Sequence, residues 1–258
     1  IETSRRLREA LTGSHRVDAT TASVQDPISF RVVPQVHGAC RDILSQFASD
    51  LDKELNATSD NPMVDIESGR ILSNGNFHPM NLTLSAESLK LALAHVGLLS
   101  ERRSGQLWDA AVSSLGAAVG GGESPPLDDG IPPSLAGLAL RYPAAARYTR
   151  LRQIAQPVTL DVPSLDLNVE DHATNAAETL WTLREVVDVV TEILVVEILI
   201  SFGRLSLEDP RTQLGAGSRR AIDLVGRVLD SLPPGTLPDE THRRVQDSLV
   251  ASLDDLAI

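Results

Sequence analysis

The chain has only one cysteine, Cys40, among its 258 residues. A single cysteine excludes an intrachain disulfide framework and any cysteine-rich zinc site. Cys40 falls on the apolar face of a predicted helix, so we expect it to act as a small buried hydrophobic residue. Aromatic residues are scarce too, at 3% of the chain against 42% for all hydrophobic residues. Aliphatic side chains must therefore dominate the packing of the core.

Basic residues are fewer than acidic ones. The chain contains 23 Lys and Arg and 35 Asp and Glu, which gives a net charge of -12. Binding phosphates requires a basic surface, so we expect no nucleic-acid partner and no peripheral role on anionic membranes. Charged residues interrupt the start of the chain, which therefore shows no secretory signal. The most hydrophobic stretch, 174–204, contains Glu185, Asp188, Glu192 and Glu197, which argues against a membrane span. We expect a cytoplasmic protein.

Methionine occurs only at Met63 and Met80, and the chain begins with Ile1. Since translation starts with methionine, we expect a trimmed product, a designed fragment or one half of a split polypeptide. These three origins stay open from the sequence.

Long stretches without Gly or Pro favour helices. From Val36 the apolar residues recur mostly at steps of three and four, which is the stripe of an amphipathic helix. The β-branched run in 174–204 is too long for a strand, and a helix apolar on most sides must be buried against several others. The sequence thus predicts an all-α fold with a long central helix bundle. The predicted helices cover residues 1–12, 36–55, 81–115, 135–155, 174–204, 217–232 and 239–257.

The remaining segments are predicted to be short or irregular. Residues 63–79 contain β-prone pieces around two turn signals, Ser68-Gly69 and Asn74-Gly75, and predict a small hairpin. An irregular polar stretch is expected from Gly13 through Pro34. Residues 116–135 are rich in Gly and Pro and predict a long mobile loop.

The first motif with chemical content runs from Gln25 to Arg31, with an amide at one end and a guanidinium at the other. Arg can grip a carboxylate through two parallel hydrogen bonds, so Arg31 suits the acid group of an amino-acid substrate. Taken alone, the run more often marks an ordinary surface Arg beside a helix start.

The second motif runs from Ser73 to His78, where Gly75 is flanked by two amides and followed by Phe77. Alone it predicts a hairpin turn with a packing aromatic. The third runs from Asn168 to His172. Its acids, Glu170 and Asp171, suit general acid–base chemistry or cap the helix that follows. We expect no metal site, because no second cluster of ligands lies at a matching helical spacing.

Taken in order, these runs resemble the C-terminal half of the histidine ammonia-lyase type within the aromatic amino-acid lyase and aminomutase family. Family members carry Gln-Asp-x-Tyr-Ser-x-Arg, Ser-Asp-Asn-Pro, Gly-Asn-Phe-His, Leu-Ser-Glu-Arg-Arg and Gln-Glu-Asp-His. The resemblance is strong over residues 22–104 and 157–172 and weaker from about 205. The matching runs here are Gln25 to Arg31, Ser59 to Pro62, Gly75 to His78, Leu99 to Arg103 and Glu170 to His172.

The resemblance implies that residues 1–258 form the C-terminal helical part of a lyase-like fold. It also implies a homotetramer whose active sites each draw on several subunits. The family eliminates ammonia from an amino acid, or moves its amino group, with a methylidene-imidazolone electrophile. That electrophile forms from an Ala-Ser-Gly tripeptide in the N-terminal half, so it is expected on a partner or a segment outside this sequence.

Carried over to this chain, the resemblance gives each matching residue a role. Arg31 would hold the substrate carboxylate, and Gln25 would orient groups beside the electrophile. Phe77 would pack near the prosthetic ring, and Asn76 would offer its amide to the substrate pocket. Glu170 would line that pocket, which implies a polar or cationic group on the substrate.

The chain departs from the family pattern at several places. Ala-Ser-Gly is absent, so this chain cannot form the electrophile by itself. Ile28, at a substrate-binding position, replaces a Tyr and cannot donate a hydrogen bond or carry a proton. Val169 replaces a Gln, and the loop 116–135 does not match well.

Two interpretations therefore stay open. In the first, the chain is one piece of an ammonia-lyase or aminomutase, and its partner is an N-terminal half or companion chain carrying Ala-Ser-Gly. In the second, it is a catalytically degenerate relative that acts as a binding or scaffold subunit, as Ile28 and Val169 suggest.

Overall fold

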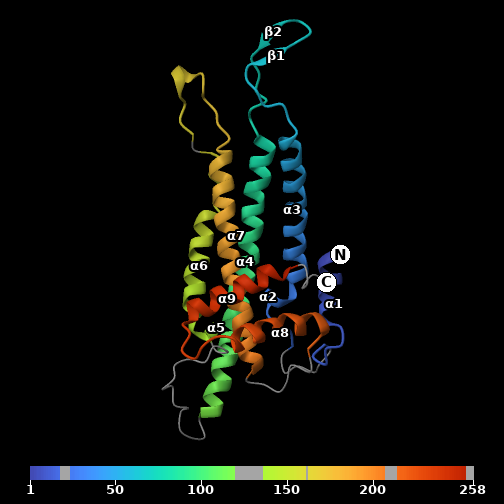
Figure 1. Cartoon of the computed structure of the whole chain (residues 1–258), viewed down its shortest axis with the longest axis vertical. Helices are drawn as coiled ribbons and strands as arrows, with labels where there is room; N and C mark the ends of the chain where they lie inside the picture. Colours follow the sequence, from blue (N-terminus) through green and yellow to red (C-terminus); the bar gives the residue numbers. More distant parts are fainter. Residues whose placement is uncertain (18–23, 120–135, 161, 207–213, 254–258) are drawn as a thin grey trace. The chain divides into compact units, whose positions relative to one another are not determined.

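The computed structural model describes residues 1–17, 24–119, 136–160, 162–206 and 214–253, and these are mostly helical (Figure 1). The predicted all-α fold is confirmed. The helices are α1 (Glu2–Leu11), α2 (Ile28–Arg31), α3 (Val33–Leu55), α4 (Met80–Val119), α5 (Ala136–Ala139), α6 (Arg141–Ile154), α7 (Ala176–Ser206), α8 (Ala216–Asp230) and α9 (Pro238–Ala251), with a short turn η2 (Asp166–Asn168). The strands are β1 (Met63–Asp65) and β2 (Arg70–Leu72).

The chain divides into two compact units, and the boundary passes through four helices, α3, α4, α6 and α7. Unit 1 comprises Ile1–Gly38, His95–Arg150 and Val189–Ile258. Unit 2 comprises Ala39–Ala94 and Leu151–Asp188.

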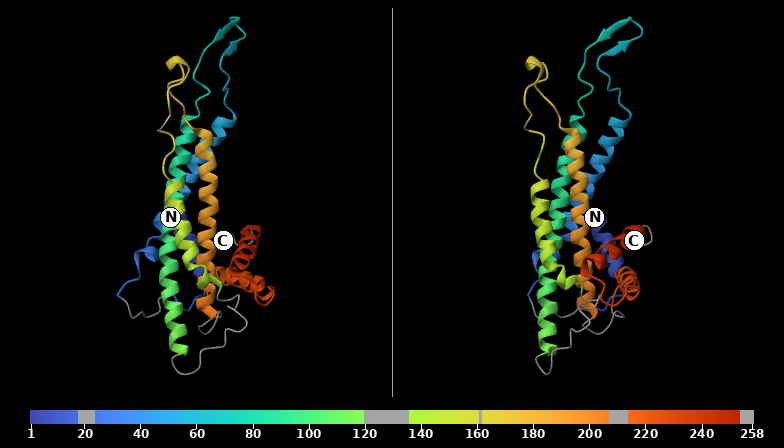
Figure 2. Two further views of the ribbon diagram at one scale, coloured as in Figure 1. Left: turned by 90° about the vertical axis from the view of Figure 1, so that its left-hand side faces the viewer. Right: turned by 60° about the vertical axis from the view of Figure 1, so that its left-hand side comes forward.

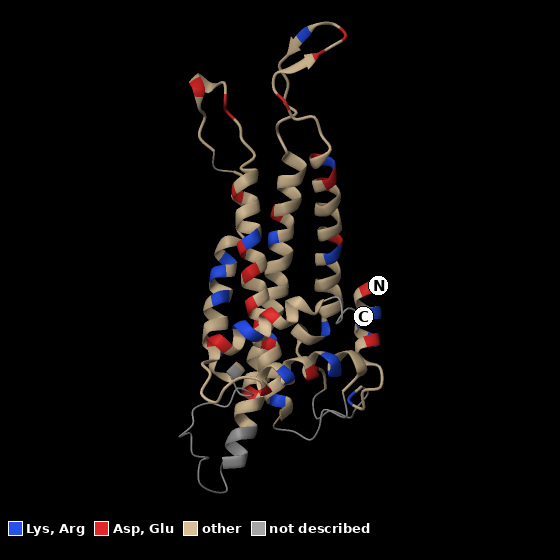
Figure 3. Cartoon of the chain, in the orientation of Figure 1, with Lys and Arg blue, Asp and Glu red and all other residues tan. Residues whose placement is uncertain are grey.

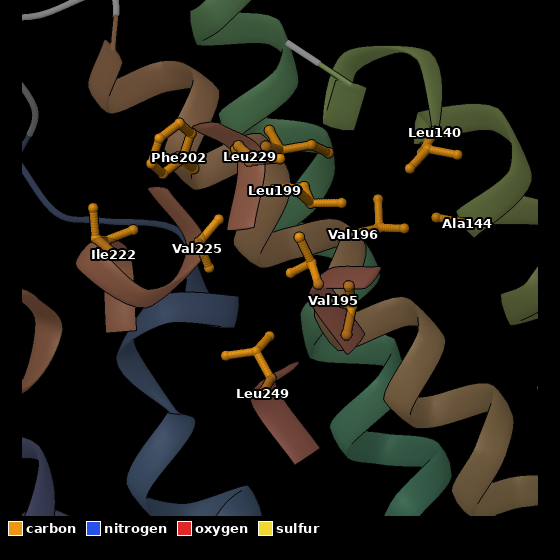
Figure 4. Close-up of a cluster of buried hydrophobic side chains, with 12 residues drawn as sticks. Leu140, Ala144, Val195, Val196, Leu199, Phe202, Ile222, Val225, Leu229 and Leu249 are labelled. Atoms are coloured by element: carbon orange, nitrogen blue, oxygen red, sulfur yellow. The ribbon is translucent and has the colours of Figure 1, made fainter. Parts of the chain in front are cut away.

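The core of unit 1 is aliphatic, as the scarcity of aromatic residues predicts. α8 and α9 lie beside the C-terminal part of α7 (Figure 2), and Figure 4 shows the side chains that fill the space between them. Gly137 of α5 is required here, because a Cβ atom would lie 2.4 Å from the backbone nitrogen of Ile200. Members of this core include Leu140, Ala144, Val195, Val196, Leu199, Phe202, Ile222, Val225, Leu229 and Leu249.

Ion pairs link the helices of unit 1 around this core. Basic residues follow one another along α6 (Figure 3). Arg141 donates to Glu101 of α4 at 2.8 Å, and Arg147 pairs with Glu192 of α7 at 2.6 Å.

Unit 2 has a smaller core, in which Ala86, Leu89 and Leu183 are buried and α3 side chains pack against them. Cys40 is one of these packing residues and is half-buried, and this burial raises the pKa of its thiol. The predicted hairpin is present, with Met63 opposite Leu72 in an antiparallel pair. It extends beyond the ends of α3 and α4 (Figure 1).

Several predicted boundaries were wrong. α2 forms within the stretch expected to be irregular, and α3 begins at Val33 with Pro34 in its first turn, where a missing N–H costs no hydrogen bond. The helix expected over 135–155 is divided into α5 and α6. α4 continues to Val119, so the first residues of the predicted loop 116–135 are helical. Residues 120–135, and the end of the helix expected to reach 257, lie outside the described residues.

In the described part of the chain, the segment Met80–Ser113 of α4 has the length and the apolar composition of a helix that could cross a membrane. Half of its most apolar window is buried inside the structure. Lys90, Glu101 and Arg103 within it are buried and ion-paired to protein side chains. Such a helix also fits the core of a helical bundle.

Candidate active site

The run from Gln25 to Arg31 belongs to unit 1 and presents its polar ends to solvent. Pro27 precedes the single helical turn α2, in which Ser29 is buried while Ile28 is 62% exposed. Gln25 and Arg31 are exposed as well. The Arg31 Nε atom donates to the carbonyl of Asp26 at 2.8 Å, which fixes the direction of the guanidinium. Within the described part of the chain, its two terminal nitrogens have no hydrogen-bond partner.

A buried arginine holds this run in place. Nη1 of Arg103 on α4 donates to the carbonyl of Ser29 at 3.2 Å. Its Nε and Nη2 donate to the carboxylate of Glu197 on α7 at 2.5 and 2.8 Å, and the two side chains are 8% and 16% exposed. In the sequence, Leu99 to Arg103 stood out only through the family resemblance. The structure shows that this run anchors α2.

The turn from Gly75 to His78 belongs to unit 2 and is built from its own amides. Asn74 accepts from the Asn76 N–H at 2.8 Å. Asn74 also donates to the carbonyl of Asp60 at 2.9 Å and to the side-chain oxygen of Asn61 at 3.0 Å. The turn is therefore tied to the Ser-Asp-Asn-Pro run, and it leaves Phe77 40% exposed.

His78 links this turn to the third run. Its Nε2 lies 3.0 Å from Nδ1 of His172, so one ring donates and the other accepts. Phe77 packs edge-on against His78, with ring centroids 5.0 Å apart. The contact brings Asn76 and Phe77 into the same part of unit 2 as the segment that carries Glu170. The sequence offered no signal for this pairing beyond the presence of a histidine in each run.

Glu170 lies at the closing end of a tight loop. Its backbone pairs with Leu165 in both directions, at 2.8 and 3.2 Å. Between them, Asp166, Leu167 and Asn168 all adopt the left-handed conformation, with φ of 47°, 57° and 68°. Leu167 is the strained member, because the left-handed region is costly for a residue without a short polar side chain. Within the described residues the Glu170 carboxylate, which is exposed, has no bonding partner.

The alternative role of the third run as a helix cap is wrong. α7 begins at Ala176, and the acid in its first turn is Glu178. Glu170 and Asp171 lie before that turn and outside it. Backbone strain next to an exposed carboxylate is more typical of a functional loop than of a cap.

The predicted site residues fall into two sets. Asn76, Phe77 and Glu170 belong to unit 2, whereas Gln25, Ile28 and Arg31 belong to unit 1. The prediction that Arg31 and Glu170 share one cavity stays a prediction. Over the described ranges, no cluster of three or more His, Cys, Asp or Glu side chains could hold a metal ion.

Comparisons of sequence point to one family. The sequence profile described as aromatic amino acid lyase matches residues 1–227. Histidine ammonia-lyase from Deinococcus radiodurans is 33% identical over 231 residues, which cover 88% of this chain and 42% of that protein. Histidine ammonia-lyase from Stigmatella aurantiaca is 31% identical over 241 residues, which cover 93% and 45%. The chain thus spans less than half the length of these curated relatives.

Solved structures agree. Tyrosine aminomutase from Streptomyces globisporus superimposes with a TM-score of 0.72 and 26% identity, covering 100% of this chain and 47% of that one. The ergothionase of Treponema denticola gives a TM-score of 0.75 at 24% identity, covering 93% and 48%. The latter likeness shows the fold alone. Together they confirm the predicted helical fold of the lyase type.

Proposed function

Because this chain belongs to the aromatic amino acid lyase family, we propose that it forms part of the active site of an ammonia-lyase or aminomutase. In this proposal it supplies the residues that bind an amino-acid substrate. The observation that carries the proposal is the presentation of Arg31. Its guanidinium is exposed and fixed through Nε, and among the described residues nothing bonds to its two terminal nitrogens; the turn that carries it is held by the buried Arg103–Glu197 pair.

Arg31 is suited to bind and orient the substrate carboxylate. The planar guanidinium forms two parallel charge-assisted hydrogen bonds with a carboxylate, which fixes both the position and the rotation of that group. Holding a substrate in the reactive geometry is one of the larger contributions that an enzyme makes to rate. Gln25 lies on the same exposed segment and would orient groups beside the reacting atoms.

Glu170 is suited to face a cationic or polar group on the substrate. A carboxylate without a protein partner gains most from an opposite charge once the site is covered and water is excluded. The relatives from Deinococcus radiodurans and Stigmatella aurantiaca are histidine ammonia-lyases. We therefore infer that an amino acid with an imidazole or similar side chain is the substrate class.

The residues of the second run fit a planar prosthetic group. Phe77 offers a partly exposed ring, and Asn76 offers its amide from the same turn. When bound, a methylidene-imidazolone group supplies the electrophile that activates the substrate. The sequence contains no Ala-Ser-Gly, so this group comes from a companion chain or a further segment of the protein.

Exposed apolar side chains support assembly with such a partner. Ile28 is 62% exposed, Val169 is 72% exposed and Leu167 is 96% exposed, and each lies close in sequence to a proposed site residue. Leu167 and Val169 lie on the same loop, and exposed apolar residues that are grouped together are typical of surfaces that become covered. A composite site within a tetrameric or pseudo-tetrameric assembly is the arrangement we propose.

A second candidate function rests on Ile28 and Val169. Each replaces a family residue with hydrogen-bonding capacity by an aliphatic one, and both side chains are well exposed. In a catalytically degenerate subunit, substrate binding through Arg31 would persist while turnover would not. Ligand binding without ammonia release separates this candidate from the enzyme.

The test is to co-express the chain with an Ala-Ser-Gly-bearing family segment and purify the complex. We expect ammonia or a β-amino acid to be released from histidine or a related amino acid. In Arg31→Met the KM should rise by on the order of 100-fold, the worth of a charge-assisted bidentate contact. Arg147→Met is the matched control, because Arg147 pairs with Glu192 far along the sequence from the proposed site residues.

A complex that binds the amino acid tightly but releases no product supports the scaffold candidate. Equal turnover in wild-type and Arg31→Met complexes would contradict the role of Arg31. Turnover by the chain alone, without any electrophile-bearing segment, would contradict the composite site.

A further inference from the structure

The connection between α6 and α7, which carries Glu170, is closed at its neck by hydrogen bonds within unit 2. Asn175, just before α7, donates through Nδ2 to the carbonyl of Val158 at 2.8 Å. Asn175 has a φ of 50°, a conformation that Asn tolerates better than most residues. The two segments of chain that enter and leave the loop are thereby joined.

A fully buried lysine lies beneath this neck. Lys90 of α4 is 0% exposed, which is exceptional for this residue type. Its ammonium donates to the carbonyl of Gln156 and to the hydroxyl of Thr182, each at 3.1 Å, and pairs with Glu87 at 2.8 Å. One cation thus contacts the end of the connection next to α6, the helix α7 and its own helix α4.

Glu87 also bonds to the end of the connection next to α6 and to α7. Its Oε1 accepts from the N–H of Val158 and from the hydroxyl of Thr179, each at 3.1 Å. The side chain is 10% exposed. The pair therefore binds the loop neck through both a carbonyl and an N–H of the main chain.

A buried ion pair of this kind is poor evidence for stability, because removing two charges from water offsets most of their attraction. An apolar pair of similar volume would pack as well between α4 and α7. What an apolar pair cannot do is hydrogen-bond to Gln156 and Val158. An apolar pair would also lose the bonds to the hydroxyls of Thr179 and Thr182 on α7, but the bonds to Gln156 and Val158 are those that reach the main chain of the loop neck.

We propose that Glu87 and Lys90 are positioning residues, which anchor the neck of the α6–α7 connection and thereby hold Glu170 in place for the substrate. The role of Glu170 rests on the function proposed above, whereas the anchoring itself does not. The pair acts through the backbone of the loop and does not contact substrate.

The direct test is hydrogen–deuterium exchange of the full chain, followed in peptides from residues 162–175. In the double variant Glu87→Leu/Lys90→Met we expect a melting temperature close to wild type, and loop exchange faster by roughly tenfold or more because its anchoring bonds are removed. Lys53→Met is the matched control. Lys53 is the chain's other lysine, lies in unit 2 and is 65% exposed beside Asp50.

A second variant keeps the test decisive if the double variant does not fold. Asn175→Gly removes only the bond to Val158 and keeps the positive φ that Gly adopts readily. It should also speed exchange in 162–175 while leaving peptides of α8 and α9 unchanged. Loop exchange at the wild-type rate in the folded double variant overturns the role of Glu87 and Lys90, and exchange at the wild-type rate in Asn175→Gly overturns the anchoring of the neck by its hydrogen bonds.

Turnover in the complex with an electrophile-bearing segment then tests positioning. We expect kcat to fall on the order of 100-fold in the double variant, as for a small misplacement of a substrate contact, and to stay unchanged in Lys53→Met. Faster loop exchange with unaltered kcat and KM overturns the positioning role. If the wild-type complex shows no turnover, the function proposed above fails, while exchange in 162–175 still decides the anchoring.

Discussion

Replacing Arg103 with methionine removes the cation from a buried ion pair and the donor that holds α2. The guanidinium makes two short bonds to Glu197 and one to the Ser29 carbonyl, and its side chain is 8% exposed. Methionine fills a similar length of apolar space but donates no hydrogen bond. The carboxylate of Glu197 is then left buried without a counter-ion.

The cost follows from this burial. Breaking a buried pair by removing one partner costs about 3–5 kcal/mol, because the remaining charge is desolvated and unpaired. For a chain of this size about 1 kcal/mol lowers the melting temperature by about 2–4 °C, so Arg103→Met should lower it by roughly 6–20 °C. Arg103→Met/Glu197→Gln should recover part of the loss, since the second change removes the orphaned charge.

Thermal unfolding followed by circular dichroism measures these shifts. The matched control is Arg147→Met, which breaks a pair in the same unit whose side chains are 54% and 29% exposed. An exposed pair contributes about 0.2–1 kcal/mol, so the control should shift by only about 4 °C or less. Equal shifts for Arg103→Met and Arg147→Met, or a double variant less stable than Arg103→Met, would refute the reasoning.

Three further predictions concern single residues or pairs. Ile28→Tyr restores a hydroxyl beside the site and should raise kcat of the complex on the order of 100-fold; an unchanged kcat contradicts the importance of that group. The rings of His78 and His172 share a hydrogen bond, so in His78→Leu imidazole nitrogen NMR should show that the ring of His172 loses this bond. An unchanged His172 signal contradicts the pairing. The hydrogen bond from Gln46 lowers the pKa of Asp50, so its stabilisation is complete above about pH 4 and disappears as pH falls further. The difference in melting temperature between wild type and Asp50→Asn should therefore shrink from pH 7 to pH 3.

The helices were predictable because periodicity and the absence of breakers act locally. α7 was identified by its length and its apolar character, which also required burial against other helices. The boundaries were less predictable where tertiary context decides. The irregular stretch was predicted to extend through Pro34. α3 nevertheless begins before this residue, because proline is tolerated in the first turn of a helix.

The types of the candidate site residues and their order along the chain could be predicted from the sequence. Their positions and contacts in space could be predicted much less well. The structure shows that Arg31 is exposed and that Glu170 lies on a loop, and their roles in binding a substrate stay predictions. The left-handed run at Leu167 has no glycine to signal it. The buried anchors, Arg103 with Glu197 and Lys90 with Gln156, join residues 94 and 66 positions apart. Only packing reveals such contacts, because charged residues in a helix are more often solvated.

Steady-state ammonia release from histidine by the assembled complex tests the shared site most directly. Wild type, Arg31→Met, Glu170→Gln and Arg147→Met should be compared at equal complex concentration. We expect kcat/KM to fall at least tenfold in both Arg31→Met and Glu170→Gln, in line with the removal of one charged contact each, and to be unchanged in Arg147→Met. Equal kcat/KM in an active wild-type complex and in these two variants would contradict the claim that Arg31 and Glu170 bind one substrate.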